Sequence, residues 1–149
     1  MIRVQEPPFD LGAELAALTA GRTDIGAVAS FVGLVRDMAD GPITTMTLEH
    51  YPGMTEAKLA EIEAEANARW LLQASLIVHR YGRMLPGEPI VLVATASAHR
   101  AAALESCAFL IDWLKTRAPF WKLEETAAAS RWVEARGSDD EAADRWQQR

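Results

Sequence analysis

Cysteine is almost absent from this chain, since Cys107 is the only one among 149 residues. A single thiol excludes an internal disulfide framework and suits a reducing compartment. No apolar run approaches the roughly 20 residues of a membrane-spanning helix, and the segment from Met1 to Glu6 lacks the apolar core of a signal peptide. We therefore expect a soluble cytoplasmic protein, folded as one domain over residues 1–149 without a disulfide or metal to stabilise it.

Several signatures of enzyme chemistry are also missing. The three histidines share no metal-ligand spacing with acidic residues or with Cys107. The chain has neither a phosphate-binding glycine loop nor a serine-triad motif. The sequence therefore predicts no metal site and no cofactor. Cys107 falls on the apolar face of a predicted helix, so we expect it in the core rather than as a nucleophile.

Charge is distributed unevenly along the chain, whose net charge of −6 argues against general nucleic-acid binding. Met1 to His79 carry eleven acidic and five basic residues, and Leu123 to Arg149 are again acidic. Arg80 to Lys122, between them, carry six basic residues against three acidic ones. A basic segment in an acidic protein fits a small bound anion. Chance fluctuation of charge is the alternative interpretation.

Hydrophobic periodicity predicts helices and strands that mix without strict alternation. A short helix is expected over 11–18, a second one after a Thr55 cap, and a long one over 100–117. The apolar faces of the two longer helices would be Leu59, Ile62, Ala66 and Trp70, and Leu104, Cys107, Ala108, Ile111 and Leu114. Strands are expected over 25–32, 43–50, 74–80 and 90–97, the last two as a hairpin through the loop 84–89. We expect a mobile loop over 37–42. After Pro119 we expect a short strand or loop, followed by a helix or tail. These elements predict the α+β class with a mixed or antiparallel sheet.

Lysine is scarce, and two of the three lysines bracket one segment, 115–122, while the chain has twelve arginines. An ammonium group held near apolar surface and other cations loses some preference for its charged form, so Lys115 and Lys122 are candidates for a nucleophile or proton donor. The alternative is that both are lysines whose stems merely cover hydrophobic surface.

Two further places in the sequence suit an anion. His99 and Arg100 lie where a strand leads into a helix, and free backbone N–H groups at a helix start attract phosphate. Arg36 follows a buried strand and a glycine, and is a candidate second anion contact. A helix start that carries a histidine and an arginine by chance, and an ordinary surface arginine, are the competing interpretations. His79 also ends a strand, and we interpret it as a structural histidine.

Five short blocks give the sequence a family resemblance. In chain order they are Phe31–Asp37, Leu48–Met54, His79–Arg83, Ser97–Arg100 and Lys115–Lys122. Together, over Gly26 to Arg136, they resemble the large, catalytic subunit of molybdopterin synthase, the MoaE-like family. The resemblance leaves residues 1–24 as an N-terminal extension and 137–149 as a C-terminal tail. It implies an α+β fold with an α/β-hammerhead element.

The resemblance implies a sulfurtransferase of molybdenum cofactor biosynthesis. Members of the family convert cyclic pyranopterin monophosphate (precursor Z) into molybdopterin by installing two dithiolene sulfurs. The sulfur arrives as a thiocarboxylate on the C-terminal Gly-Gly tail of a ubiquitin-like small subunit. Two large subunits form a dimer with one small subunit at each end, a heterotetramer.

Site residues follow from the same resemblance. Lys115 and Lys122 match the family's two active-site lysines. His99 and Arg100 match the pair of residues in its substrate pocket, and Arg36 matches its arginine after the first strand. The substrate-binding set also includes Leu34, Val35, Leu123 and Glu124. Leu34 and Leu123 stand where relatives often carry a basic residue, which predicts a less positive pocket. One other function remains open at this stage, namely a non-catalytic scaffold that docks a ubiquitin-like tail or an anionic metabolite. A phosphometabolite enzyme without a protein partner would need its own nucleophile or cofactor motif, and the sequence has none.

Overall fold

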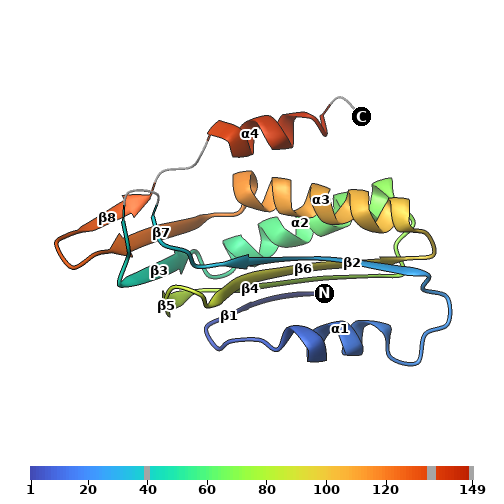
Figure 1. Ribbon diagram of the computed structural model, residues 1–149. Helices are drawn as coiled ribbons and strands as arrows, with labels where there is room; N and C mark the ends of the chain where they lie inside the picture. The colour runs from blue at the N-terminus through green and yellow to red at the C-terminus, as the bar shows by residue number, and fades with distance from the viewer. Residues whose placement is uncertain (39–40, 134–136, 148–149) are drawn as a thin grey trace.

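Two four-stranded sheets organise the fold in the computed structural model, which describes residues 1–38, 41–133 and 137–147 (Figure 1). The first sheet has the order β1-β4-β6-β2, in which only the β1–β4 pair is parallel. Its strands are β1 (Ile2–Gln5), β4 (Ala74–Arg80), β6 (Pro89–Ser97) and β2 (Ala27–Leu34). The second sheet is antiparallel, with the order β5 (Gly82–Met84), β3 (Thr45–His50), β7 (Phe120–Glu125) and β8 (Ser130–Val133). The predicted α+β class is confirmed.

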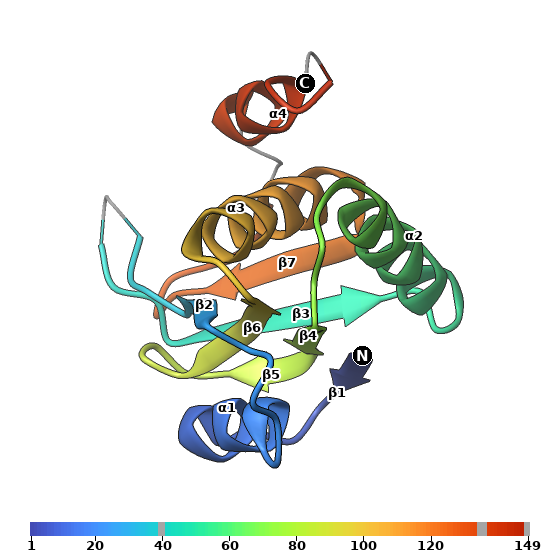
Figure 2. The same cartoon turned by 90° about the vertical axis from the view of Figure 1, so that its right-hand side faces the viewer.

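Helices cover both faces of the first sheet. The two long helices, α2 (Met54–Arg69) and α3 (Arg100–Arg117), lie on one face, and α1 (Leu11–Thr19) lies on the other (Figure 2). The short helix α4 (Gly137–Asp144) packs on α3, away from the sheet. Within the described residues, no helix combines the length and the apolarity that crossing a bilayer requires.

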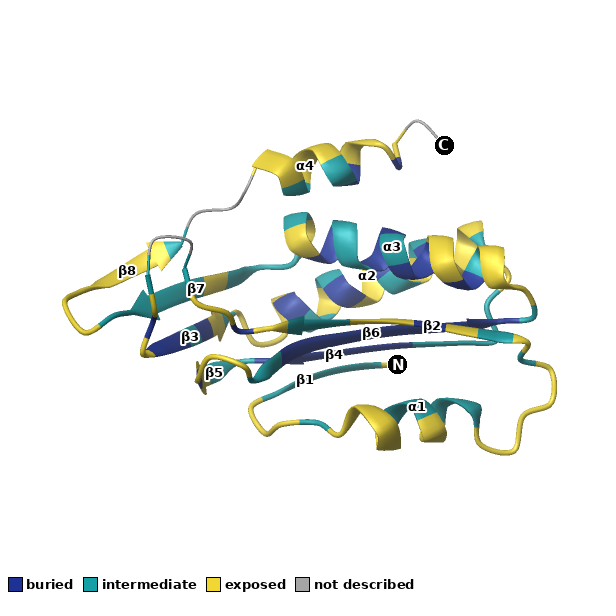
Figure 3. Ribbon diagram, viewed as in Figure 1, coloured by how far each residue is buried: buried dark blue, intermediate teal, exposed yellow. Residues whose placement is uncertain are grey.

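The core follows from the two covered faces of β6. Val91 and Val93 belong to the main buried cluster, together with Phe109 of α3. Their neighbours Leu92 and Ala94 belong to a second cluster, against which α1 packs. Because successive strand residues point to opposite faces, a strand buried on both sides is almost continuously apolar. The run from Ile90 to Ala96 is buried accordingly (Figure 3), and its one polar side chain, Thr95, donates a hydrogen bond to the Ala103 carbonyl at 2.6 Å.

The start of α2 differs from the prediction that Thr55 caps it. The helix begins at Met54, with Gly53 as its cap at φ +85°, a conformation that favours glycine. The Glu56 carboxylate accepts a hydrogen bond from the Gly53 N–H at 2.6 Å. Thr55 is buried inside the first turn, where its hydroxyl donates to the Pro119 carbonyl at 3.2 Å. The Thr55 cap was therefore wrong, because Thr55 is the second residue of the helix and its hydroxyl oxygen accepts the Tyr51 N–H at 3.2 Å.

The long helix α3 has the predicted bounds but a different buried face. Cys107 and Leu114 are buried as expected, whereas Leu104 is 61% exposed. The buried stripe instead contains Phe109, Leu110 and Trp113. The period was right, but the buried stripe is rotated around the helix from the predicted one and shares only Cys107 and Leu114 with it, so the predicted core position of Leu104 was wrong.

Three other segments refine the predicted strands. β4 and β6 pair antiparallel as expected, but the connection between them also forms β5, which leaves to join the second sheet. β1 was not predicted, and neither was the length of β7. The loop predicted over 37–42 includes residues 39–40, which lie outside the described residues, while Met38 and Gly41 form an isolated bridge.

Candidate active site

A cavity of about 600 Å³ lies where the two sheets meet the C-terminal end of α3. Its walls come from the end of β2, from β3, β4, β7 and β8, and from residues near the ends of α3 and α4. Six of the nine predicted site residues line it, namely Leu34, Val35, Arg36, Lys115, Lys122 and Glu124. The cavity therefore collects most of the predicted site from segments that are far apart in the sequence.

The basic side chains reach the cavity from three different elements. Arg36 follows β2, whose register shifts at Gly33 and Leu34, and buried Val35 ties this segment down by donating its N–H to the Glu88 carbonyl at 2.9 Å. Lys115 stands on the last turn of α3, and Lys122 on β7. Two primary amines and a guanidinium group on one concave surface suit an anionic substrate.

Strand alternation explains which residues of β7 face the cavity. Lys122 and Glu124 are two positions apart and line it together with Phe120. Leu123 does not line it and points to the opposite face, where it pairs with Trp132 of β8. Trp121 also lies on that face, with its ring against Tyr51 at a centroid distance of 4.3 Å. The structure thus separates Leu123 from the other predicted site residues.

Glu124 is the acidic member of the cavity with an incomplete set of partners. Its Oε2 is buried and receives no hydrogen bond from any described residue. Among the described residues it pairs with the guanidinium of Arg131, 3.8 Å away, and Arg131 also contacts the Met38 sulfur. A carboxylate oxygen buried in this way is available to accept a hydrogen bond from a bound molecule.

His79, which the sequence analysis interpreted as a structural histidine, also lines the cavity. It is the penultimate residue of β4 and is 4% exposed. Its ring stacks on Phe120 with centroids 3.6 Å apart and planes at 16°. Burial, opposed by the Arg80 hydrogen bond and reinforced by Lys115, Lys122 and His50, lowers the pKa of His79 to about 3. Arg131, Asp37 and Asp139 line the cavity too, and nothing in their sequence context distinguishes them from surface residues.

His99 and Arg100 lie at the other end of α3 from this cavity. His99 is the N-cap residue of the helix and Arg100 its first residue, whereas Lys115 is on its last turn. At 1.5 Å per residue, about 24 Å of helix separates His99 from Lys115. Both His99 and Arg100 are exposed. One copy of the chain therefore does not bring this pair to the lysines.

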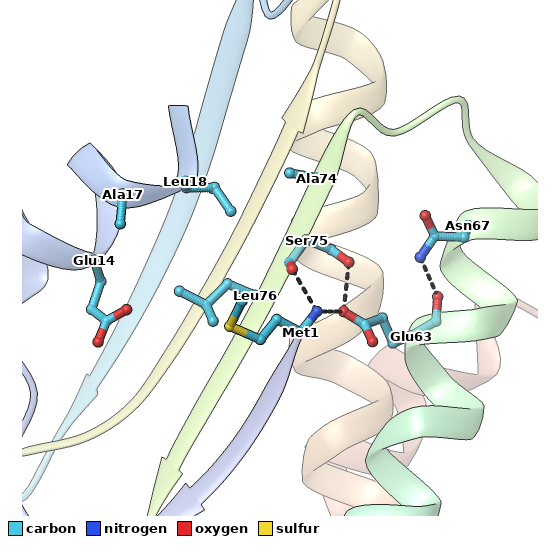
Figure 4. Close-up of a pocket in the computed structure, with 9 residues that line it drawn as sticks. All are labelled: Met1, Glu14, Ala17, Leu18, Glu63, Asn67, Ala74, Ser75 and Leu76. Atoms are coloured by element: carbon cyan, nitrogen blue, oxygen red, sulfur yellow. Dashed lines mark hydrogen bonds and ion pairs between the residues drawn. The ribbon is translucent and has the colours of Figure 1, made fainter. Parts of the chain in front are cut away.

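A second cavity, of about 490 Å³, lies near the N-terminus and contains none of the predicted site residues (Figure 4). The Met1 ammonium group binds Glu63 at 2.5 Å and the Ser75 carbonyl at 2.8 Å. The other carboxylate there, Glu14, pairs with Arg3. Since both carboxylates already have cationic partners, we place the candidate site in the cavity that holds the lysines. No group of three or more potential metal ligands occurs among the residues that the structure describes.

Comparison with known proteins identifies the family of the chain. A family model described as MoaE protein matches residues 4–117. The molybdopterin synthase catalytic subunit of Pseudomonas aeruginosa is 59% identical over 148 residues, which cover 99% of both chains.

Solved structures give the same result. The molybdopterin biosynthesis MoaE protein from Burkholderia ambifaria matches with a TM-score of 0.85 and 54% identity, over 99% of this chain and 97% of its own. Molybdopterin synthase from Staphylococcus aureus matches with a TM-score of 0.82 and 30% identity, over 89% and 96%. The architecture, the lysine-lined cavity and these similarities lead to one conclusion, that the chain belongs to the MoaE family.

Proposed function

We propose that this chain is the catalytic subunit of a molybdopterin synthase. It transfers sulfur from the thiocarboxylated tail of a small subunit to cyclic pyranopterin monophosphate, and so forms the molybdopterin dithiolene. One observation carries the proposal beyond family membership: Lys115, Lys122 and Arg36 arrive from three separate elements at one cavity. A sulfurtransferase acting on a phosphorylated pterin needs cations for the substrate and an amine near the reacting atoms.

The roles of the cavity residues follow from their chemistry. Arg36 presents a guanidinium fork that suits the substrate phosphate. Lys115 assists attack on the thiocarboxylate or proton transfer at the reacting carbons, and Lys122 stabilises the developing negative charge. Glu124, with its unsatisfied Oε2, accepts a hydrogen bond from the pterin. Leu34 and Val35 supply the wall beside Arg36.

His99 and Arg100 enter this proposal through a second copy of the chain. They are exposed and lie about 24 Å from Lys115 along α3, so they do not reach the cavity of their own subunit. In the homodimer that the family resemblance implies, the two subunits contribute identically, so an exposed pair from one subunit that reaches the cavity of the other does so at both sites. We therefore assign His99 and Arg100 to the substrate pocket of the opposite subunit.

The partners are a ubiquitin-like small subunit that delivers sulfur on its C-terminal Gly-Gly tail, and a second large subunit, in a heterotetramer. A cavity of about 600 Å³ is within the range of sites for small molecules. We assign the assembly to the cytoplasm, where Cys107 remains a thiol.

Reconstitution tests the function. The purified chain alone is expected to make no dithiolene from precursor Z, and product should form when the thiocarboxylated small subunit is added. A small subunit with an ordinary carboxylate terminus serves as the control, since it offers the same docking surface without the sulfur. Complex formation without product in every combination would instead identify a scaffold.

A further inference from the structure

The turn between β5 and β6 contacts the segment that carries Arg36. It consists of Leu85, Pro86, Gly87 and Glu88, and the Glu88 N–H donates to the Leu85 carbonyl at 3.1 Å. Gly87, the third residue, has φ +90°. Proline in second place and glycine at positive φ in third place are typical of a type II turn. None of these four is among the described residues that line the cavity, so the turn acts on the site only through what it holds.

This turn holds Val35, the residue before Arg36, by two backbone hydrogen bonds. Val35 donates its N–H to the Glu88 carbonyl at 2.9 Å, and its own carbonyl accepts the Gly87 N–H at 2.6 Å. The two bonds follow the point where the β2–β6 register shifts and where Pro89 lies opposite β2. Proline has no N–H to donate, so the regular ladder is interrupted there. The turn therefore fixes the backbone just before Arg36.

The side chain of Glu88 fixes the turn to the first sheet. One of its carboxylate oxygens accepts the Leu85 N–H, and the other lies 3.4 Å from a guanidinium nitrogen of Arg80. Arg80 ends β4 and is 5% exposed, and the same nitrogen donates to the Pro89 carbonyl at 3.0 Å. A carboxylate that accepts a backbone N–H and pairs with a buried guanidinium has few other positions available. Glu88 thereby joins the turn to the end of β4.

The backbone is also restrained on the other side of Arg36. A carboxylate oxygen of Asp37 accepts the N–H of Ile43, two residues before β3, at 3.2 Å. The backbone at Arg36 is thus held from both sides, although the residue is exposed. A guanidinium group whose attachment point is fixed before binding loses less freedom when it pairs with a phosphate.

We propose that Glu88 is a positioning residue for the substrate phosphate. Its carboxylate fixes the turn, the turn fixes Val35, and Val35 fixes the point from which the guanidinium of Arg36 enters the cavity. This inference rests on the proposed function, which assigns the substrate phosphate to Arg36. Glu88 does not touch the substrate, so its removal should weaken binding of the phosphorylated pterin more than it slows the chemical step.

Hydrogen exchange of the Val35 amide, followed by NMR, tests the geometry without any activity. We expect this amide to exchange at least about tenfold faster in Glu88→Ala and in Gly87→Ala than in the wild type, since both changes disturb the turn that accepts its hydrogen bond. Gly21→Ala is the matched control, because Gly21 also has a positive φ (+69°), and an added Cβ meets nothing within 4 Å at either glycine. Wild-type protection of Val35 in folded Glu88→Ala, or equal acceleration in Gly21→Ala, would overturn the proposal.

Kinetics with saturating thiocarboxylated small subunit test the consequence at the site. We expect the KM for precursor Z to rise about tenfold in Glu88→Ala, while kcat changes by less than about twofold. Glu56→Ala is the control for lost stability, because Glu56 also accepts a backbone N–H, that of Gly53 at the start of α2, and does not line the cavity within the described residues. It should keep the wild-type KM.

A double-mutant cycle separates positioning of Arg36 from general damage. If Glu88 acts through Arg36, Glu88→Ala should raise KM no further in an Arg36→Ala background, whereas independent effects would multiply. Multiplied effects, or a wild-type KM in a folded Glu88→Ala variant, contradict the proposal. If Glu88→Ala does not fold, Gly87→Ala replaces it in the exchange test and in the cycle, with the same expected and contradicting results. Failure of the wild-type protein to make product would refute the proposed function and leave the exchange test of Val35 intact.

Discussion

Lys115 and His99 lie at opposite ends of α3, about 24 Å apart along the helix. The family resemblance implies that both residues act at one site. A single helix cannot bring its own ends together, so this relationship requires two copies of the chain if the assignment of His99 and Arg100 holds.

The first prediction is complementation between inactive subunits. Lys115→Ala and Arg100→Ala should each lose most activity as homodimers. Random pairing makes half of the dimers mixed, with one subunit of each variant. If each site combines Lys115 of one subunit with Arg100 of the other, a mixed dimer has one site with both residues intact and one site with both replaced. Product formation with the small subunit is expected to reach about a quarter of the wild-type rate.

The control for this experiment mixes Lys115→Ala with Lys122→Ala. Both residues line the cavity of the same subunit, so no mixed dimer regains an intact site. A Lys115→Ala and Arg100→Ala mixture that is no more active than this control would show that His99 and Arg100 do not complete a shared site.

The second prediction concerns Gly26, which precedes β2. A Cβ added to Gly26 would lie 2.2 Å from the Ala98 carbonyl oxygen, a backbone atom that does not move aside readily. Gly26→Ala should therefore lower the free energy of unfolding by about 2 kcal/mol, measured by urea denaturation. Gly12→Ala is the matched control, because Gly12 is in α1 with 3.5 Å to its nearest neighbour, and alanine favours a helix. Equal stability of the two variants would refute the contact.

The third prediction concerns Trp146, which anchors the segment after α4. Its side chain is 3% exposed, lies against Trp70 and Phe109, and donates its indole N–H to Asp112 at 2.7 Å. Trp146→Ala should lower the free energy of unfolding by about 3 kcal/mol. Trp132→Ala, at a side chain that is 55% exposed, should change it by less than about 0.5 kcal/mol, as measured by circular dichroism in urea. Similar values for both would contradict this packing.

Cys107 gives the fourth prediction. Burial raises the pKa of its thiol to about 11, so the thiol stays protonated at pH 8 and does not react as a thiolate. Iodoacetamide should label the folded protein far more slowly than the urea-unfolded protein, as followed by mass spectrometry. Cys107→Ala is expected to keep wild-type kcat. Loss of activity in a folded Cys107→Ala variant would show that Cys107 has a role in the reaction that the cavity geometry does not predict.

The sequence predicted the elements whose own pattern is strong. α3 has the predicted bounds because its apolar residues recur at helical spacing and Pro119 ends it. β1 was missed, since four residues at a sheet edge carry little pattern and pair in parallel with β4. The length of β7 was missed, and the segment was expected only as a short strand or loop, because its cavity face alternates Phe120, Lys122 and Glu124, and two of these are charged.

The site residues also fall into those that the sequence predicted and those that it did not. Scarcity drew attention to Lys115 and Lys122, and the structure brings both to one cavity. His79 was interpreted as structural, because only the meeting of β4 with the second sheet shows that its ring borders the lysines. The position of His99 relative to Lys115 depends on assembly, which spacing along one chain does not encode.

The most direct test of the account replaces Lys115 in the reconstituted enzyme. With precursor Z and the thiocarboxylated small subunit in excess, Lys115→Ala should lower the rate of dithiolene formation at least about a hundredfold, while the variant still binds the small subunit. Lys58→Ala, which changes an exposed lysine paired with Glu61 on α2, should keep the wild-type rate. A Lys115→Ala enzyme that forms molybdopterin as fast as Lys58→Ala would contradict the proposed active site.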